Sequence, residues 1–93
     1  MDRKTLEYME GRAAKAREIV DRIEELLRDI ERVKRSGNIE IYTPTRSVYI
    51  NDYHHKGVLP SSSRTYLFAL MINLFIDVTL QEIQQLESEL AEL

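Results

Sequence analysis

The sequence has no cysteine, and this absence removes several classes of site from consideration. A chain without thiols forms no disulfide bonds and no cysteine-ligated zinc or iron–sulfur site. The absence also fits an intracellular protein, because disulfides belong mainly to oxidising compartments. With 93 residues, the chain is long enough for one domain at most.

A basic face is also missing. Residues 1–36 hold ten Lys and Arg against nine Asp and Glu, whereas residues 67–93 hold no basic residue and five acidic ones. A protein that binds nucleic acid normally presents a cluster of positive charge to the phosphate backbone. Nucleic acid is therefore not an expected partner, and the interleaved charges of residues 1–36 indicate a solvated helix face.

The sequence has little in the way of long apolar runs. Its first twelve residues lack the apolar core of a signal peptide. The longest apolar stretch, residues 66–76, is interrupted by Asn73 and closed by Asp77. It has about half the length that spans a membrane. We therefore predict a soluble, cytoplasmic protein with no membrane partner.

Residues 3–35 have the apolar periodicity of a long helix. From Leu6 to Ile30, apolar residues recur at alternating steps of three and four, which is the seam of a coiled coil. The seam consists of Leu6, Met9, Ala13, Ala16, Val20, Ile23, Leu27 and Ile30. A second line of apolar residues widens it: Ile19, Leu26 and Val33. We therefore expect this helix to meet more than one neighbour.

Two glycines have predicted roles in this first helix. Gly37 follows the last turn, where a residue in the left-handed conformation commonly ends a helix. Gly11 lies near Ala13, Ala14 and Ala16, and these small residues suggest a close approach between two helices. The alternative for Gly11 is a weak point near a frayed helix end.

Residues 63–92 are predicted to form a second helix of similar length. Pro60 and the three serines after it indicate its start, with one serine capping the free N–H groups. Apolar residues recur at steps of three and four from Ala69 to Leu93. Residues 66–80 are apolar on nearly every face, so they must be buried nearly all round. We therefore predict a homo-oligomer with residues 66–80 at its centre, since large exposed apolar patches usually mark interfaces.

Between the helices, the apolar period changes from about 3.5 to two, which predicts a β-hairpin over residues 38–50. The turn signal lies at residues 43–46. Pairing residue 39 with 50 and residue 41 with 48 places the branched side chains on one face, against the helices: Ile39, Ile41, Val48 and Ile50. The opposite face then points away from the core: Glu40, Tyr42, Ser47 and Tyr49. A polar loop is predicted over residues 51–60.

The predicted fold is therefore α+β, with two long coiled-coil-like helices flanking a β-hairpin in a single domain. The hairpins are expected to gather at one end of an oligomeric helical core. An isolated two-stranded hairpin is marginal in water, so this one needs the helices or the strands of another subunit.

His54 and His55 are the first candidates for chemistry, since histidine is the commonest metal ligand and proton shuttle. Adjacent side chains point in different directions, however, and only Asp52 is near enough in sequence to add a ligand. Two solvated loop histidines are the preferred interpretation. The serines at 61–63 lack the glycine-flanked turn of a nucleophilic serine. We predict no metal, no cofactor and no enzymatic activity.

An anion-binding site is better supported. The serines stand at a predicted helix N-terminus, where free N–H groups and the helix dipole favour negative charge. The predicted roles are phosphate binding by Arg46, Lys56 and Arg64, stacking by Tyr42, Tyr49 and Tyr53, and hydrogen bonding by Asn51, Ser61, Ser62 and Ser63. These residue types suit a small anionic, nucleotide-like ligand bound between subunits. In the plainer alternative, Ser63 only caps the helix, the arginines pair with Glu40 or Asp52, and the tyrosines cover the sheet.

The helix–hairpin–helix layout, with the tail LQEIQQLESELAEL, resembles small accessory proteins encoded in bacteriophage genomes. Several compact oligomers of that group are nucleotide sponges, which sequester cyclic or ADP-ribose-type immune signals of bacterial defence systems without cleaving them. The resemblance implies an anti-defence role of that type.

The layout is also similar to prefoldin subunits, in which two coiled-coil helices flank strands that assemble the oligomer. The competing functional hypothesis needs only the helices. It is a coiled-coil interaction module that scaffolds or inhibits a host protein through an outer helix face.

Overall fold

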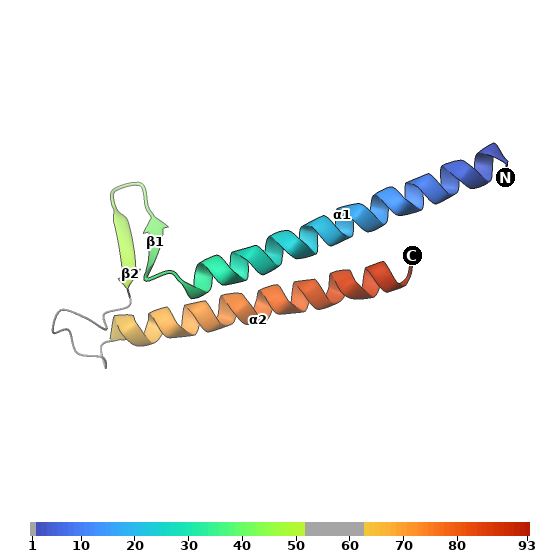
Figure 1. Cartoon of the computed structure of the whole chain (residues 1–93). Coiled ribbons are helices and arrows are strands. Elements are labelled where there is room, and N and C mark those ends of the chain that lie inside the picture. The colour runs from blue at the N-terminus through green and yellow to red at the C-terminus, as the bar shows by residue number, and fades with distance from the viewer. Residues whose placement is uncertain (1, 52–62) are drawn as a thin grey trace.

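The computed structural model describes residues 2–51 and 63–93, which form two long helices and one β-hairpin (Figure 1). The elements in chain order are α1 (Arg3–Lys34), β1 (Asn38–Tyr42), β2 (Ser47–Asn51) and α2 (Ser63–Ala91). The predicted α+β layout is confirmed, with element ends within one residue of their expected places. Apart from Asn51, which ends β2, the loop predicted over residues 51–60 lies outside the described residues.

Helix α1 has a defined cap at each end. The Asp2 side chain accepts a hydrogen bond from the backbone N–H of Thr5 at 2.7 Å, which satisfies one of the free donors of the first turn. At the other end, the Ser36 hydroxyl donates to the carbonyl oxygen of Val33 at 2.9 Å. The expectation for Gly37 was wrong, because this glycine does not adopt the left-handed conformation. The serine and a tightened last turn satisfy the carbonyls instead.

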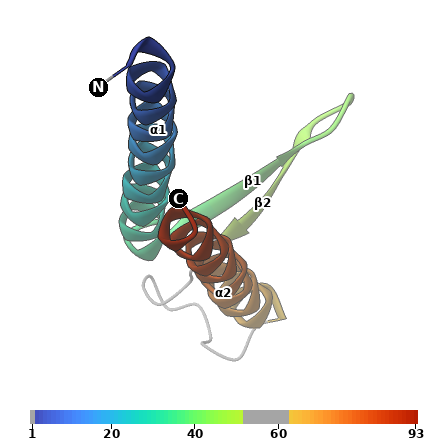
Figure 2. The ribbon, with the colours of Figure 1, turned by 90° about the vertical axis from the view of Figure 1, so that its right-hand side faces the viewer.

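The two helices lie side by side and antiparallel, as both ribbon views show (Figures 1 and 2). Leu26 and Ile30 of α1 and Ile83 of α2 form the buried contact between them. Three partly buried residues extend this contact: Ile23, Ile76 and Leu86. One ion pair crosses the same interface, with 3.5 Å between Arg22 Nη2 and Glu82 Oε2.

The seam predicted for α1 is only partly the one that contacts α2. The residues of α1 that are buried are Ile19, Leu26 and Ile30, and two of these belong to the line expected merely to widen the seam. Leu27, from the predicted seam, is 47% exposed. Leu6 and Met9 are also exposed, near the start of α1. The line of α1 that contains Leu6, Met9 and Leu27 is therefore exposed and is not covered by α2.

The strand pairing predicted for the hairpin is confirmed. Ile39 lies opposite Ile50 and Ile41 opposite Val48 in an antiparallel ladder. Only the base of the hairpin packs on the helices, because Ile50 is 4% exposed whereas Ile41, nearer the turn, is 44% exposed. Figure 2 shows the hairpin projecting sideways from the helix pair. Its apolar face is thus covered at one end and open at the other.

The single chain is far from compact. Its radius of gyration is 20.3 Å, compared with about 12 Å for a compact domain of this length. Its accessible surface is 7575 Å², whereas a compact monomer of 10.9 kDa exposes about 5,600 Å². The difference of about 2,000 Å² exceeds the ~800 Å² that each partner contributes to a standard protein interface. The chain therefore exposes more surface than a compact monomer of its mass.

Candidate functional site

The outward face of the hairpin is organised around one carboxylate. Glu40 lies opposite Tyr49 in the strand ladder, and Tyr42 lies opposite Ser47. Hydrogen bonds from the hydroxyls of Ser47, Tyr42 and Tyr49 lower the pKa of Glu40. The same contact acts on the tyrosines, since the hydrogen bond to Glu40 and its negative charge raise the pKa of both Tyr42 and Tyr49. The hydroxyls of this face therefore favour the ionised form of Glu40.

This arrangement changes the predicted role of the outward face. Tyr42 is 81% exposed and Tyr49 is 47% exposed, so both rings remain accessible for stacking. The negative charge between them disfavours a phosphate but favours a hydrogen-bond donor, such as an amino group or a hydroxyl. The sequence patterns placed Glu40 on this face without a binding role. The signal that would have found it is its cross-strand position opposite Tyr49.

Arg64 joins the hairpin to the start of α2. Its Nη1 donates to the backbone carbonyl oxygen of Tyr49 at 2.6 Å, across fifteen positions of sequence. The guanidinium therefore stands beside β2, in the first turn of α2. Asn51 ends the same strand, and its Oδ1 is buried without a hydrogen-bond partner among the residues that the structure describes. Arg64, Tyr49 and Asn51 are thus brought together at this junction.

Arg46 lies at the other end of the hairpin. The turn is closed by the backbone N–H of Thr43, which donates to the carbonyl oxygen of Arg46 at 3.1 Å, and by the Thr43 hydroxyl, which donates to the same oxygen. The backbone N–H of Arg46 donates back to Thr43 Oγ1 at 3.0 Å. Arg64, by contrast, contacts β2 at Tyr49, three positions along the strand from Arg46.

Several predicted site residues cannot be placed. Tyr53, Lys56, Ser61 and Ser62 lie outside the described residues, as do His54 and His55. Ser63 begins α2, but its side chain is also outside the described part. The predicted serine cap of α2 and the approach of Lys56 therefore remain predictions.

An apolar cleft of about 350 Å³ opens where α1, β1 and α2 meet. Val33 and Ile39 line one side of it, and Met71, Ile72 and Phe75 of α2 line the other. Its remaining lining residues are Ser36 and Asn38. With an almost wholly apolar wall, this cleft suits a hydrophobic side chain better than a charged ligand.

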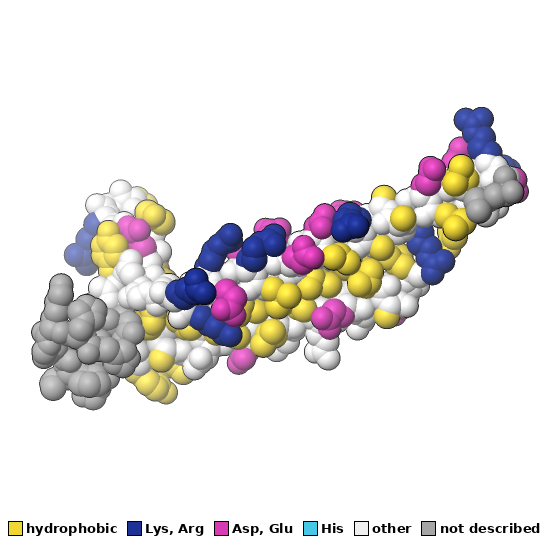
Figure 3. All heavy atoms as spheres, viewed as in Figure 1, with side chains coloured by type: hydrophobic (Ala, Val, Ile, Leu, Met, Phe, Trp, Pro, Cys, Tyr) yellow, Lys and Arg dark blue, Asp and Glu magenta, His cyan; other side chains and the backbone are white. Residues whose placement is uncertain are grey.

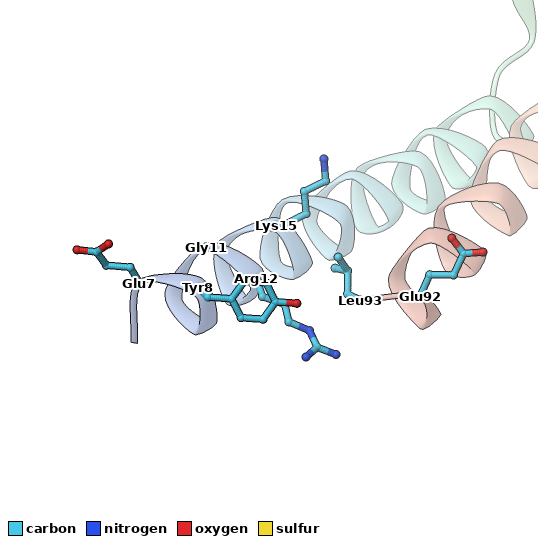
Figure 4. A pocket seen from close by; sticks show the side chains of 7 residues that line it. All are labelled: Glu7, Tyr8, Gly11, Arg12, Lys15, Glu92 and Leu93. Carbon is cyan, nitrogen blue, oxygen red and sulfur yellow. The ribbon is translucent and has the colours of Figure 1, made fainter. Parts of the chain in front are cut away.

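A second cleft, of about 580 Å³, lies between α1 and the end of α2 (Figure 4). Tyr8, Gly11 and Leu93 line it together with two basic and two acidic residues: Arg12, Lys15, Glu7 and Glu92. The balanced charges give it no preference for an anion. A Cβ atom added at Gly11 would have no neighbour within 4 Å, so the predicted close helix approach at Gly11 is not found in the described chain.

The helices expose much apolar surface, and Figure 3 shows a hydrophobic band running along them beside charged side chains. On α2, the exposed large apolar residues are Tyr66, Leu67, Leu70, Leu74, Phe75, Val78 and Leu80. By length and composition, Arg64–Ala91 is also apolar enough to cross a membrane, and only 17% of its most apolar window is buried. The window contains Asn73 and Asp77, which are costly within a lipid bilayer.

Comparisons with protein-family models, with curated proteins and with solved structures each found no match. The functional argument for this chain therefore rests on its own residues.

Proposed function

We propose that this chain is a non-enzymatic, homo-oligomeric protein that binds and sequesters a small anionic, nucleotide-like ligand. The observation that carries the proposal is the hydrogen bond from Arg64 to the carbonyl oxygen of Tyr49. It places a cation from the first turn of a 29-residue helix against the backbone of β2, at the residue that carries one of the outward tyrosine rings. A phosphate is favoured there by the guanidinium and by the positive end of the helix dipole.

The surrounding groups suit the rest of a nucleotide. The Tyr49 ring offers a stacking surface for a base. Glu40, kept ionised by three hydroxyl donors, accepts hydrogen bonds from an exocyclic amino group or a sugar hydroxyl. Asn51 Oδ1 adds a buried acceptor beside the same strand. The ligand would therefore lie with its phosphate toward Arg64 and its base toward Glu40.

Sequestration, rather than turnover, accounts best for these groups. The rings and charges of the junction bind and orient a ligand, and the proposal assigns none of them a proton to transfer. An anti-defence sponge, as the layout resemblance implies, is the biological role proposed for this binding.

Released ligand is the direct test of the proposal. The purified protein is denatured, and the supernatant is searched for nucleotides by mass spectrometry. Thermal melts with cyclic nucleotides and ADP-ribose derivatives then extend the search. A ligand present at a hundred times its Kd is expected to stabilise the protein by about 2.7 kcal/mol.

Two arginine variants give this test a matched control. Arg64→Gln removes the charge at the start of α2, and we expect at least a tenfold loss of affinity. Arg46→Gln removes an equal charge at the turn of the hairpin, outside the junction of β2 with α2, and it should change affinity less. The absence of any nucleotide effect, together with capture of a specific protein partner, would overturn the proposal.

The second candidate is a coiled-coil interaction module that scaffolds or inhibits another protein. The specific observation in its favour is the open apolar line on α1, where Leu6, Met9 and Leu27 are each about half exposed. An amphipathic helix of a partner would lie along such a line. Replacing Met9 and Leu27 with glutamate would abolish capture of that partner, whereas the sponge proposal predicts unchanged nucleotide binding.

A further inference from the structure

Helix α2 carries a second seam, separate from the residues Ile76, Ile83 and Leu86 that pack against α1. Leu67, Met71, Leu74 and Val78 recur at steps of four, three and four, which is the spacing that packs one helix against another. Leu74 is 63% exposed and Val78 is 56% exposed, although leucine and valine are among the residues most often buried. Leu70, beside this seam, is also exposed. We call Leu67, Met71, Leu74 and Val78 the α2 outer seam.

The α2 outer seam adjoins the apolar cleft, so a helix that packs along the seam would also reach the cleft. Met71 belongs to both, since it also lines the cleft together with Val33 and Phe75. A helix laid along the seam would therefore have a socket of about 350 Å³ for an apolar side chain. The chain exposes about 2,000 Å² more than a compact monomer of its mass. A standard interface buries about 800 Å² on each partner, so this excess is large enough to include a contact with such a helix.

We propose that the α2 outer seam packs antiparallel against the α2 outer seam of a second copy of this chain, with the two Leu74 residues at the two-fold axis. This inference rests on the homo-oligomeric part of the proposed function and not on its ligand. Isologous pairing of one patch with itself is the commonest way to close a dimer. In this register, Leu67 faces Gln81 of the partner subunit, and Met71 lies within one residue of the level of Val78 of the partner subunit.

Charge selects the antiparallel orientation. Residues 67–93 contain five acidic residues and no basic one, so a parallel pair would place each carboxylate beside its own copy. The antiparallel pair instead places the acidic end of each α2 beside the start of the other α2. The helix dipole is positive there, and Arg64 adds a full positive charge. The polar continuation of the seam, through Gln81 and Gln85, then lies toward the rim.

Cysteine cross-linking tests this register directly, because the natural chain has no thiol of its own. Leu67→Cys and Gln81→Cys variants are purified separately and mixed without ligand under mild oxidation. The proposal expects a disulfide-linked dimer only in the mixture. In the antiparallel pair, the two copies of position 67 are separated by about 21 Å along the helix axis, which no disulfide bridges. Efficient cross-linking of either variant with itself would overturn the antiparallel register.

Light scattering tests the seam without cysteines. The wild-type chain is expected at twice 10.9 kDa or a multiple of that mass, and Leu74→Glu at 10.9 kDa. Leu80→Glu is the matched control, because Leu80 is a similarly exposed leucine of α2 outside the outer seam. It should retain the wild-type mass. An unchanged mass for Leu74→Glu, or a wild-type monomer at micromolar concentration, overturns the proposal.

Two further outcomes separate this inference from its rivals. If the wild-type protein floats with phosphatidylcholine vesicles and the mixed Leu67→Cys and Gln81→Cys variants give no cross-link, α2 lies in lipid, which overturns the dimer. A protein that cross-links in the stated register but releases no nucleotide keeps the interface. In that case only the proposed ligand fails.

Discussion

At the scale of single residues, Gly11 occupies a position where the described chain has room for a larger side chain. A Cβ atom at this position meets open space, and the position lies within helix α1. Glycine in a helix interior is about 1 kcal/mol less favourable than alanine. We expect Gly11→Ala to stabilise the protein by about 1 kcal/mol in urea denaturation. Ala14→Gly, at an exposed position of the same helix, should cost a similar amount. A Gly11→Ala variant that is less stable, or that changes oligomeric mass, would show that another copy approaches closely here.

Glu40 makes the stability of the hairpin depend on pH. Its pKa in the folded chain is lowered by the hydroxyls of Ser47, Tyr42 and Tyr49. The stability that ionised Glu40 contributes is therefore fully present above its pKa in the unfolded chain, about 4.3. It is lost as the pH falls through the lower pKa of the folded chain. Glu40→Gln should remove this part of the acid sensitivity, as measured by thermal melts between neutral and acid pH. Glu10→Gln, which removes an exposed carboxylate from α1, is the control and should leave it in place.

The tyrosines provide an independent readout of the same contact. The pKa values of Tyr42 and Tyr49 are raised by Glu40, so their contribution is present below the unfolded value of about 10 and is lost as the pH rises through the folded values. An NMR titration of the two rings in Glu40→Gln should show both pKa values moving downward. Ring titrations that do not respond to the substitution would mean that Glu40 does not accept these hydrogen bonds.

At the scale of elements, adjacent leucines distinguish the two lines of α1. Leu26 is 5% exposed against α2, and Leu27 is 47% exposed. Truncation of a buried leucine typically costs 2–5 kcal/mol, and this small core suggests a cost of about 2 kcal/mol for Leu26→Ala. Leu27→Ala should cost below about 1 kcal/mol in the same urea titration. Equal losses at the two positions would contradict the packing of α2 over the Ile19–Leu26–Ile30 line.

The elements were largely predictable from the sequence, because each depends on local chemistry. The steps of three and four predict both helices, and the alternation around Thr43–Arg46 predicts the register of the hairpin. Which line of α1 faces α2 was not predictable in the same way. Both lines have helical spacing, and only the position of the partner helix decides which one is buried. The end of α1 was also not predictable from its glycine. The Ser36 hydroxyl binds a carbonyl oxygen of the last turn, and Gly37 does not adopt the left-handed conformation.

The candidate site was predictable in composition but not in arrangement. The sequence identifies Tyr42 and Tyr49 as outward rings, since strand alternation alone determines that face. It does not show that Arg64 would donate to a backbone carbonyl fifteen positions away, because that contact depends on how the hairpin base docks on α2. Nor does it show that Glu40 would draw both tyrosine hydroxyls toward itself.

At the scale of the whole molecule, the open shape of the chain makes its stability depend on protein concentration. The described chain has six buried apolar side chains, a thin core for 93 residues. If a second copy covers the α2 outer seam, folding and association are linked by mass action. A hundredfold dilution of a dimer then lowers its apparent stability by about 2.7 kcal/mol. This loss of about 2.7 kcal/mol per dimer is about 1.4 kcal/mol for each chain. For a chain of this size it corresponds to a fall of roughly 5–10 °C in Tm.

Scanning calorimetry at two concentrations a hundredfold apart measures this shift, and Leu74→Glu is the control whose Tm should not depend on concentration. Small-angle X-ray scattering of the same variant adds a check on shape, because a folded monomer should keep a radius of gyration near 20.3 Å. A wild-type Tm that is the same at both concentrations would mean that the chain is stable alone. Its exposed α2 face would then need a different partner, since an apolar patch of this extent is rare on a stable monomer.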